Sequence, residues 1–307
     1  YARRGLVTFK ESELGDLAAL ERSVYARRWG RSLGFVNSLD AVAALLEGTP
    51  APEGAAAFLR AALSFAELSP ADHQRVTELE SALCAKTGLA AFDPARPGRQ
   101  RVVGMGALGE PLLVGTIEHA AADRRLAGGL LPAALPSTAP SRAYLKVEEA
   151  ALRFGLDLRR GERVLELGSA PGGGTLALLQ RGLGVVAVDP GEMAPAIAAE
   201  ADRLGVAYEH RQIPAGALTK KNLPKDVAWL VSDMNLSARI VLRYADRVVP
   251  PLRRSLRGVV LTMKLGDAKA EREVPNFVER VRRYGFAEVR AHQLPSHRSE
   301  LAIAAFR

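Results

Sequence analysis

A glycine-rich segment in the second half of the chain is the strongest local signal for ligand binding. The apolar run Val164–Leu167 leads into a turn of mostly small residues and then into a helical pattern. Glycines at such a turn let the backbone approach a ligand closely, and helix N-terminal amides point toward it. The segment is neither a G-x-G-x-x-G nor a G-x-x-x-x-G-K-[ST] motif, which favours a nucleoside over a pyrophosphate. The candidate cofactor contacts are Gly168, Ser169, Ala170, Pro171, Gly172 and Gly173.

Asp189 follows the next predicted strand and is a second candidate for ligand binding. An acid at this position accepts hydrogen bonds from ribose hydroxyls in related sheets. Asp189 also precedes Pro190-Gly191, where aspartate commonly stabilises a turn or caps a helix. Both roles are compatible, and the glycine-rich segment upstream favours the ligand role.

Two lysines and an aspartate occur near places where strands should end. Lys264 ends a predicted buried strand, between Met263 and Leu265, and Asp233 ends the strand before it. Ligands of open α/β sheets bind at this carboxyl edge. Lys146 lies in a helix expected to pack beside the sheet. A lone lysine is usually a solvated charge, but the apolar neighbours of Lys264 argue against that interpretation there.

The elements that would position these residues alternate between apolar strands and amphipathic helices from residue 136 onward. Such alternation predicts a mainly parallel sheet with helices on both faces. The last two strands are joined by a short loop, so they should be antiparallel. The predicted strands are 163–167, 185–189, 206–209, 227–233, 258–264, 286–293 and 300–306. The predicted helices are 175–182, 192–204, 237–248 and 271–284.

The first 135 residues predict a smaller α+β domain. A segment with three prolines and no charge, 128–141, separates it from the rest and places the boundary near residue 136. No catalytic constellation is visible before that boundary. The predicted strands are 6–9, 101–107 and 111–118, and the predicted helices are 12–28, 38–47, 56–66 and 71–86.

Five motifs resemble, in their order along the chain, those of the FtsJ/RrmJ-like RNA ribose 2′-O-methyltransferases. They are Pro140-Ser141-Arg142-Ala143-Tyr144-Leu145-Lys146, Ser169-Ala170-Pro171-Gly172-Gly173, Val231-Ser232-Asp233-Met234, Thr262-Met263-Lys264-Leu265 and Ser299-Glu300. The resemblance covers residues 140–307. It implies a class I (Rossmann-like) methyltransferase fold with a seven-stranded sheet, S-adenosyl-L-methionine (SAM) as cofactor, and no metal. It also implies a catalytic tetrad, which consists of Lys146, Asp233, Lys264 and Glu300.

Within that family the resemblance is greatest to enzymes that methylate a cytidine ribose of 23S rRNA and carry an N-terminal THUMP-containing region. At the N-terminus it rests on Arg4-Gly5-Leu6-Val7-Thr8-Phe9-Lys10 and on the paired strands before the linker. It implies an RNA-recognition (THUMP-like) domain over 1–135 and a catalytic domain over 136–307. The implied partner is RNA, namely 23S rRNA or its precursor.

The implied reaction explains why these residue types are needed. A ribose 2′-hydroxyl must lose its proton as the methyl group moves to oxygen. A lysine accepts that proton only where burial or a neighbouring cation destabilises its charged form. We therefore expect Lys264 to be the base, held by Asp233, and Glu300 to hold Lys146. The five histidines show no metal-ligand spacing.

Two positions depart from the family pattern. Gly174 stands where members usually carry an aromatic residue, which predicts looser packing against the cofactor. Residues 210–213 lack the acid that contacts the adenine amino group, and Gln212 is the candidate substitute.

The composition is that of a globular protein with a basic surface. Of the 307 residues 48% are hydrophobic and 25% charged, and the net charge of +8 favours polyanionic partners. A single cysteine, Cys84, excludes an internal disulfide framework. No apolar run would cross a bilayer and no signal peptide is visible, so we expect a cytoplasmic protein. The candidate RNA contacts are Lys220, Lys221, Lys225, Arg253, Arg254, Arg257, His297 and Arg298.

Other functions remain open at this point. Methylation of tRNA or of a small molecule would use the same cofactor, and an RNA-binding protein on an inactive methyltransferase fold would use none of the chemistry. The complete tetrad disfavours the inactive alternative, and the basic charge with the N-terminal domain disfavours a small molecule. The nucleotide methylated and the oligomeric state are left open, and a monomer is assumed.

Overall fold

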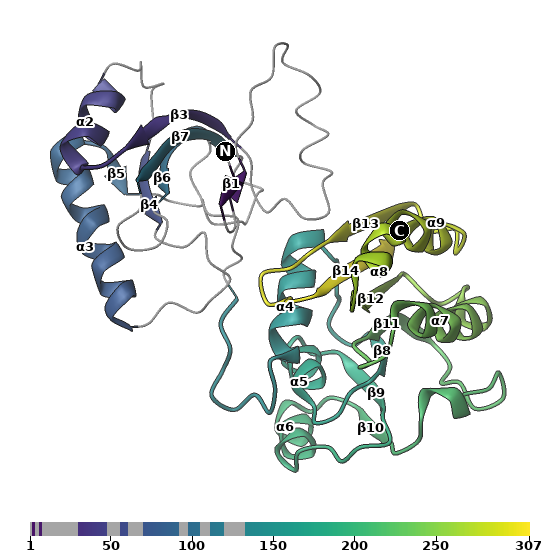
Figure 1. The fold of residues 1–307 in the computed structure, drawn as a ribbon. Helices are drawn as coiled ribbons and strands as arrows, with labels where there is room; N and C mark the ends of the chain where they lie inside the picture. Colours follow the sequence, from purple (N-terminus) through teal and green to yellow (C-terminus); the bar gives the residue numbers. More distant parts are fainter. Residues whose placement is uncertain are drawn as a thin grey trace. The chain divides into compact units, whose positions relative to one another are not determined.

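The computed structural model describes residues 2–3, 6–7, 30–47, 56–60, 70–91, 98–104, 111–119 and 133–307. The chain divides into two compact units, Tyr1–Pro132 and Ala133–Arg307 (Figure 1). Within the described ranges, no helix has the length and apolar character to cross a membrane.

A five-stranded sheet is the centre of the N-terminal unit, with the strand order β3-β7-β6-β4-β5. Val42, Leu46, Leu83 and Val114 form a small buried cluster between this sheet and its helices. The strands are β3 (Arg31–Val36), β4 (Ala56–Arg60), β5 (Ala90–Ala91), β6 (Gly98–Gly104) and β7 (Leu112–His119), and a separate antiparallel pair is β1 (Ala2–Arg3) and β2 (Leu6–Val7). The helices are α2 (Leu39–Glu47) and α3 (Pro70–Thr87).

Most predicted elements of this unit that fall on described residues are confirmed. They include the helices predicted at 38–47 and 71–86 and the antiparallel pairing of β6 with β7. The helix predicted at 56–66 is wrong, because Ala56–Arg60 forms β4 and pairs in parallel with β6. A short apolar run fits a helix or a strand equally well, and here the neighbouring strand decides. Strand β3 was not predicted, since Gly34 (φ 154°) interrupts its alternation. The helix predicted at 12–28 lies outside the described residues.

The C-terminal unit contains a seven-stranded sheet with the order β10-β9-β8-β11-β12-β14-β13. Only β14 runs against its neighbours, β12 and β13, so the predicted parallel sheet with one antiparallel strand is confirmed. Its strands are β8 (Arg163–Leu167), β9 (Gly184–Val188), β10 (Tyr208–Arg211), β11 (Val227–Ser232), β12 (Gly258–Lys264), β13 (Glu288–His292) and β14 (Glu300–Phe306). Its helices are α4 (Ala143–Phe154), α5 (Gly173–Gln180), α6 (Ala196–Leu204), α7 (Ala238–Leu252), α8 (Ala268–Arg272) and α9 (Val274–Arg282), with a short 3₁₀ turn η1 (Ala215–Ala217).

Differences from the predicted boundaries have local causes. The single helix predicted at 271–284 is two helices, because Pro275 lies at the start of α9 and lacks the N–H that would continue α8. Helix α6 begins only at Ala196, after two prolines in the preceding loop. Helix α7 instead extends past its predicted end, through Pro250 and Pro251 to the buried Leu252.

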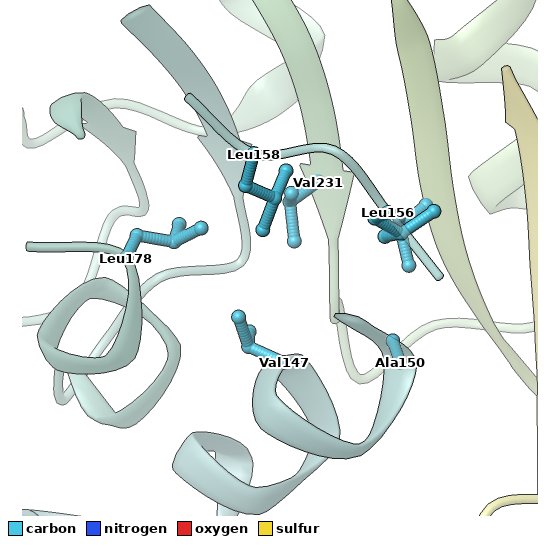
Figure 2. Close-up of a pocket in the computed structure, with 7 residues that line it drawn as sticks. Val147, Ala150, Leu156, Leu158, Leu178 and Val231 are labelled. Carbon is cyan, nitrogen blue, oxygen red and sulfur yellow. The ribbon is translucent and has the colours of Figure 1, made fainter. Parts of the chain in front are cut away.

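Helix α4 packs on the sheet through one apolar face. Val147, Ala150 and Phe154 are buried there, and the helix ends at Gly155 in the left-handed conformation (φ 65°). Figure 2 shows that side chains of α4, the following loop and the neighbouring elements point into one small space. That cavity has a volume of about 10 Å³ and an entirely apolar lining. It is therefore part of the core packing that fixes α4.

Candidate active site

The glycine-rich loop between β8 and α5 is shaped so that side chains could not replace its glycines. Gly168 has φ 80°, and a Cβ there would lie 2.7 Å from Met234 Cα. Gly172 has φ 113°, and its Cβ would lie 2.6 Å from Ile197 Cγ1. The N–H of Gly168 donates to the Val188 carbonyl at 3.0 Å, which ties the loop to β9. The backbone is therefore held close to the carboxyl ends of β8 and β9.

Two buried hydroxyl groups beside this loop suit a polar ligand. Ser169 Oγ and Ser232 Oγ are buried, and neither has a hydrogen-bond partner among the described residues. Ser169 lies in the loop itself, and Ser232 is the last residue of β11. Buried polar atoms normally have partners, so these two fit a site that binds a polar molecule.

Asp189 and Gln212 lie together at the edge of this loop region. Asp189 Oδ1 accepts the Gly191 N–H at 2.7 Å, which is the turn role that its sequence context indicates. The exposed Gln212 donates from Nε2 to the Pro190 carbonyl at 3.4 Å. Neither contact occupies Asp189 Oδ2 or Gln212 Oε1, so each residue keeps an acceptor atom for a nucleoside.

The four residues of the implied tetrad come together at the carboxyl edge of the sheet. Lys146 Nζ lies 2.9 Å from Asp233 Oδ1 and 3.2 Å from Glu300 Oε1. Lys264 Nζ donates to the same oxygen, Glu300 Oε1. Two cations therefore share one carboxylate oxygen. The side chains are 10–28% exposed, so the charges are only partly screened by solvent.

Strand register and one helix position explain this convergence. Lys264 is the last residue of β12 and lies directly opposite Glu300, the first residue of β14, in the antiparallel ladder. Asp233 follows β11, and its N–H donates to the Leu167 carbonyl at 3.0 Å. Lys146 reaches both carboxylates from α4. The four side chains thus come from four elements of one rigid sheet and its covering helix.

The ion pairs within the tetrad differ in one respect from those expected from the sequence. We expected Asp233 to hold Lys264, but both oxygens of Asp233 accept hydrogen bonds from Lys146, at 2.9 and 3.0 Å. The long side chain of Lys146 reaches between the two carboxylates, whereas Lys264 is paired across the ladder with Glu300. The expected contact between Glu300 and Lys146 is present at 3.2 Å.

These contacts determine the charges of two residues of the tetrad, Lys146 and Glu300. Burial alone would lower the pKa of Lys146, but the charges and hydrogen bonds of Asp233 and Glu300 outweigh burial and raise that pKa. Burial alone would raise the pKa of Glu300, but the Lys264 hydrogen bond and the charges of both lysines lower it. Lys146 is therefore a stable cation and Glu300 a stable carboxylate at neutral pH.

Glu166, inside β8 next to the glycine-rich loop, is a buried acid that sequence reasoning did not single out. Its carboxyl group accepts a hydrogen bond from Thr175 Oγ1 at 2.5 Å and is 2% exposed. Burial raises its pKa to about 8, Thr175 opposes this shift, and the charges of Asp233 and Asp189 add to it. An acid within an apolar strand, next to a glycine-rich turn, was the available signal.

The glycine at position 174 is explained by the same acid. A Cβ on Gly174 would overlap Glu166 Oε1 and lie 3.4 Å from Val147 Cγ2. The space that the family pattern assigns to an aromatic side chain is therefore filled by the Glu166 carboxyl group. Gly174 and Glu166 are both buried, and the looser packing against the cofactor that was predicted here stays a prediction.

Several predicted RNA contacts lie at the wrong edge of the sheet. Arg257 immediately precedes β12, whereas Lys264 ends it, so the seven-residue strand separates them by roughly 20 Å. Arg257 pairs with Asp157 and Glu162, and Arg253 donates to the carbonyls of Tyr284 and Gly285.

Other predicted RNA contacts differ in their position and exposure. Lys225 accepts a hydrogen bond on its carbonyl from Arg163, the first residue of β8, and so also lies at the amino edge. His297 is buried, with only 2% of its surface exposed. Lys220, Lys221 and Arg298 are exposed on loops that follow strands β10 and β13.

Among the residues placed by the structure, no group of three or more His, Cys, Asp or Glu side chains is arranged to hold a metal ion.

Comparison with known proteins identifies relatives of the C-terminal unit. The family model described as FtsJ-like methyltransferase matches residues 139–299. A protein of Halorhodospira halophila named Ribosomal RNA large subunit methyltransferase M is 35% identical over 177 residues, which are 56% of this chain and 49% of that protein. A protein of the same name from Teredinibacter turnerae is 36% identical, over 49% of this chain and 42% of its own.

The chain thus spans about half the length of the curated relatives it matches. Among solved structures, a Burkholderia thailandensis 1,6-didemethyltoxoflavin-N1-methyltransferase with bound S-adenosylhomocysteine is 20% identical. That match covers 55% of this chain and 79% of the other chain, with a TM-score of 0.41.

Proposed function

The chain belongs to the FtsJ-like methyltransferase family, whose methyl donor is SAM, and we propose that it methylates a ribose 2′-hydroxyl of RNA. The observation that carries this proposal is the convergence of Lys146 and Lys264 on Glu300, with Asp233 beside the glycine-rich loop. This arrangement offers a proton acceptor, a fixed cation and two carboxylates at the edge where α/β sheets bind ligands.

The residues present fit the cofactor. The backbone of Gly168–Gly173 and the hydroxyls of Ser169 and Ser232 would contact the nucleoside, and Asp189 would accept hydrogen bonds from its ribose. Gln212 is the proposed contact of the adenine amino group, through its free carbonyl oxygen. When bound, SAM supplies an already activated methyl group, so the protein's contribution is mainly alignment and proton removal.

Lys264 is the proposed general base for the 2′-hydroxyl. It stands at the open edge of β12, and its deprotonated form would take the hydroxyl proton as the oxygen becomes methylated. Lys146, a stable cation held by Asp233 and Glu300, would stabilise negative charge developing on that oxygen. Glu300 would hold Lys264 in place from the opposite strand.

Large-subunit ribosomal RNA is the proposed substrate, on the basis of the two relatives named for that activity. The N-terminal unit, proposed as the RNA-recognition (THUMP-like) domain, would select the RNA. Exposed basic residues on the loops that follow β10 and β13, Lys220, Lys221 and Arg298, would pair with phosphates. A ribosomal RNA substrate would place the protein in the cytoplasm.

The decisive experiment measures methyl transfer from labelled SAM to a 23S rRNA transcript, with mapping of the 2′-O-methyl group. Lys264→Ala should lower kcat by about 10²- to 10⁴-fold, because it removes the general base. Lys264→Arg should fail as well, since guanidinium does not lose its proton at neutral pH. Lys269→Ala, which changes an exposed lysine of α8, is the matched control and should keep full activity.

Calorimetry separates effects on cofactor binding from effects on the methyl-transfer step. Both Lys264 variants should bind SAM as the wild type does, whereas Asp189→Ala should bind it roughly tenfold or more weakly through loss of the ribose hydrogen bonds. Near-normal turnover of Lys264→Arg would exclude the general-base role. Tight NAD binding without SAM binding would exclude the proposed function.

A further inference from the structure

His297 is a buried histidine at the edge of the tetrad with a fixed ring orientation. It ends the turn Leu294–His297 between β13 and β14, and its N–H donates to the Leu294 carbonyl at 3.0 Å. The Leu294 N–H in turn donates to His297 Nδ1 at 3.3 Å. Because Nδ1 is an acceptor in this contact, a neutral ring carries its proton on Nε2.

The surroundings keep this ring neutral. Burial lowers the pKa of His297 to about 3. The charge of Glu300 and a hydrogen bond with the Glu300 backbone oppose this shift, and the charges of Lys146 and Lys264 add to it. These three groups approach the ring from β14, α4 and β12. At neutral pH the side chain is therefore an uncharged donor beside three charged members of the tetrad.

The donor on Nε2 makes no hydrogen bond to a described side chain. His297 Nε2 is buried and has no hydrogen-bond partner of good geometry among the described residues, while the Glu300 backbone interacts with the ring. Its charged neighbours Lys146 and Lys264 are donors only, so Glu300 is the group among them that can accept its proton. Both lysines donate to Glu300 Oε1, so Oε2 keeps acceptor capacity for the ring.

We propose that His297 is a positioning residue of this site, whose Nε2–H donates to Glu300 in the substrate complex and keeps that carboxylate aligned between the two lysines. Catalytic hydrogen bonds are often long without substrate and shorten in the reacting complex. The inference rests on the proposed methyl transfer, because it assigns His297 to the same reaction.

Two substitutions distinguish the role of Nδ1 from the role of Nε2. In His297→Asn the amide oxygen can replace Nδ1 as acceptor of the Leu294 N–H, but nothing replaces Nε2–H. In His297→Gln the amide nitrogen can reach the position of Nε2, but the acceptor in the turn is lost. With full-length protein, SAM and 23S rRNA transcript, we expect His297→Gln to keep kcat within about threefold and His297→Asn to lose about tenfold or more, at unchanged KM for SAM.

A purely structural turn would give the reverse order, with the Asn variant active and the Gln variant impaired, and that result would overturn the proposal. Equal, near-normal kcat in both variants would overturn it too. Histidine ¹⁵N NMR of the full-length wild type gives a second readout that needs no turnover. We expect the Nε2–H tautomer from pH 5 to 8 and a shift of the Nε2–H signal when S-adenosylhomocysteine and RNA are added.

An Nδ1–H tautomer, or an Nε2–H signal that does not respond to S-adenosylhomocysteine and RNA, excludes the role even where both variants lose the fold. Failure of the proposed function is recognised separately, because the wild type would then methylate no RNA while the tautomer could still be measured.

Discussion

Glu166 and Gly174 form a single packing unit next to the glycine-rich loop. The carboxyl group occupies the space next to the glycine, and Thr175 donates to it from the same helical turn. A carboxyl group in such a buried position is stable when neutral, since ionisation would place a charge away from water and close to Asp233 and Asp189. Two predictions at the residue scale follow from this unit, one electrostatic and one steric.

The electrostatic prediction concerns stability against pH. The pKa of Glu166 is raised from 4.5 to about 8 in the folded protein, so the folded state holds a proton that the unfolded state has released. Its contribution to stability is complete below about pH 4.5 and is lost as pH rises through 8, with a slope of at most about 1.4 kcal/mol per pH unit. Glu166→Gln should flatten this decline in denaturant titrations from pH 5 to 8. Glu192→Gln, at an exposed acid, should retain it; equal slopes in the Glu166→Gln variant and the wild type would show that Glu166 is ionised.

The steric prediction concerns Gly174→Ala. Alanine has the higher helix propensity, by up to about 1 kcal/mol. Its Cβ would, however, overlap the Glu166 carboxyl group, and overpacking of a core costs about 1–3 kcal/mol. We therefore expect a lower Tm, and we expect Glu166→Asp in the same chain to restore part of it by withdrawing the carboxyl group. Gly266→Ala, whose Cβ would meet nothing within 4 Å, is the control. A Gly174→Ala variant as stable as the wild type would contradict the packing described here.

Sequence reasoning found the residues of the site better than it found their partners. Lys146, Asp233, Lys264 and Glu300 were placed by motif, and the structure brings them together. The pairing of Asp233 with Lys146 depends on how far a side chain on α4 reaches, which no spacing encodes. His297 was expected to be a basic surface group, but it is buried in its turn beside the adjacent β14 and two elements distant in sequence, α4 and β12.

At the scale of elements, one stripe of α4 holds the end of the sheet. Lys146, Glu149 and Arg153 follow one another at helical spacing and contact Glu300, Ser296 and His292 in that order. The β13–β14 hairpin is thereby fixed to a helix whose apolar face is itself buried in the core. The strand pattern predicted both β12 and β14 with their full bounds, because continuous apolar runs mark buried strands. Helix–hairpin contacts of this kind are not periodic and were not predicted.

The contact between α4 and the turn of the β13–β14 hairpin can be tested at Glu149. Its carboxylate accepts the Ser296 N–H at 2.8 Å and the Ser296 hydroxyl at 2.7 Å, and the side chain is buried. Glu149→Ala should lower stability by about 1.5–3 kcal/mol for each hydrogen bond lost, and it should lower kcat because the turn that precedes Glu300 is released. Ser296→Ala keeps the N–H contact and should cost only about 0.5–1.5 kcal/mol. Thermal unfolding and SAM calorimetry check both variants; SAM affinity that falls in parallel with kcat would place the effect in the cofactor loop instead.

At the scale of the molecule, the two edges of the C-terminal sheet differ in what their basic residues do. At the amino edge Arg257 and Arg253 are used in ion pairs and backbone contacts that hold elements together. At the carboxyl edge Arg298 is exposed two residues before Glu300, and Lys220 and Lys221 are exposed on the loop between β10 and β11. Composition alone could not separate these groups, because net charge carries no position. Net charge alone therefore does not identify which basic residues would contact RNA.

The last prediction concerns the division of labour between the two units. Within the part of the chain that the structure describes, the buried cluster around β8 and α5 is formed by residues of Ala133–Arg307. A fragment with these residues should therefore fold and bind SAM with the affinity of the whole chain. If the N-terminal unit positions RNA, as proposed, the fragment should lose most methylation of the 23S rRNA transcript. Contacts far from the reacting ribose raise its effective concentration at the site without changing the chemical step.

Salt dependence distinguishes the two units in the same assay. A protein that contacts 6–10 phosphates loses about 10³- to 10⁵-fold in affinity between 50 and 200 mM salt, and the slope of log K against log salt scales with the number of contacts. The slope for the full chain should therefore be clearly steeper than the slope for the fragment. A fragment that aggregates or binds SAM poorly would show that the N-terminal unit covers an apolar face of the catalytic unit. A soluble fragment that methylates the transcript as well as the whole chain does would exclude both roles of the N-terminal unit, namely RNA positioning and coverage of an apolar face.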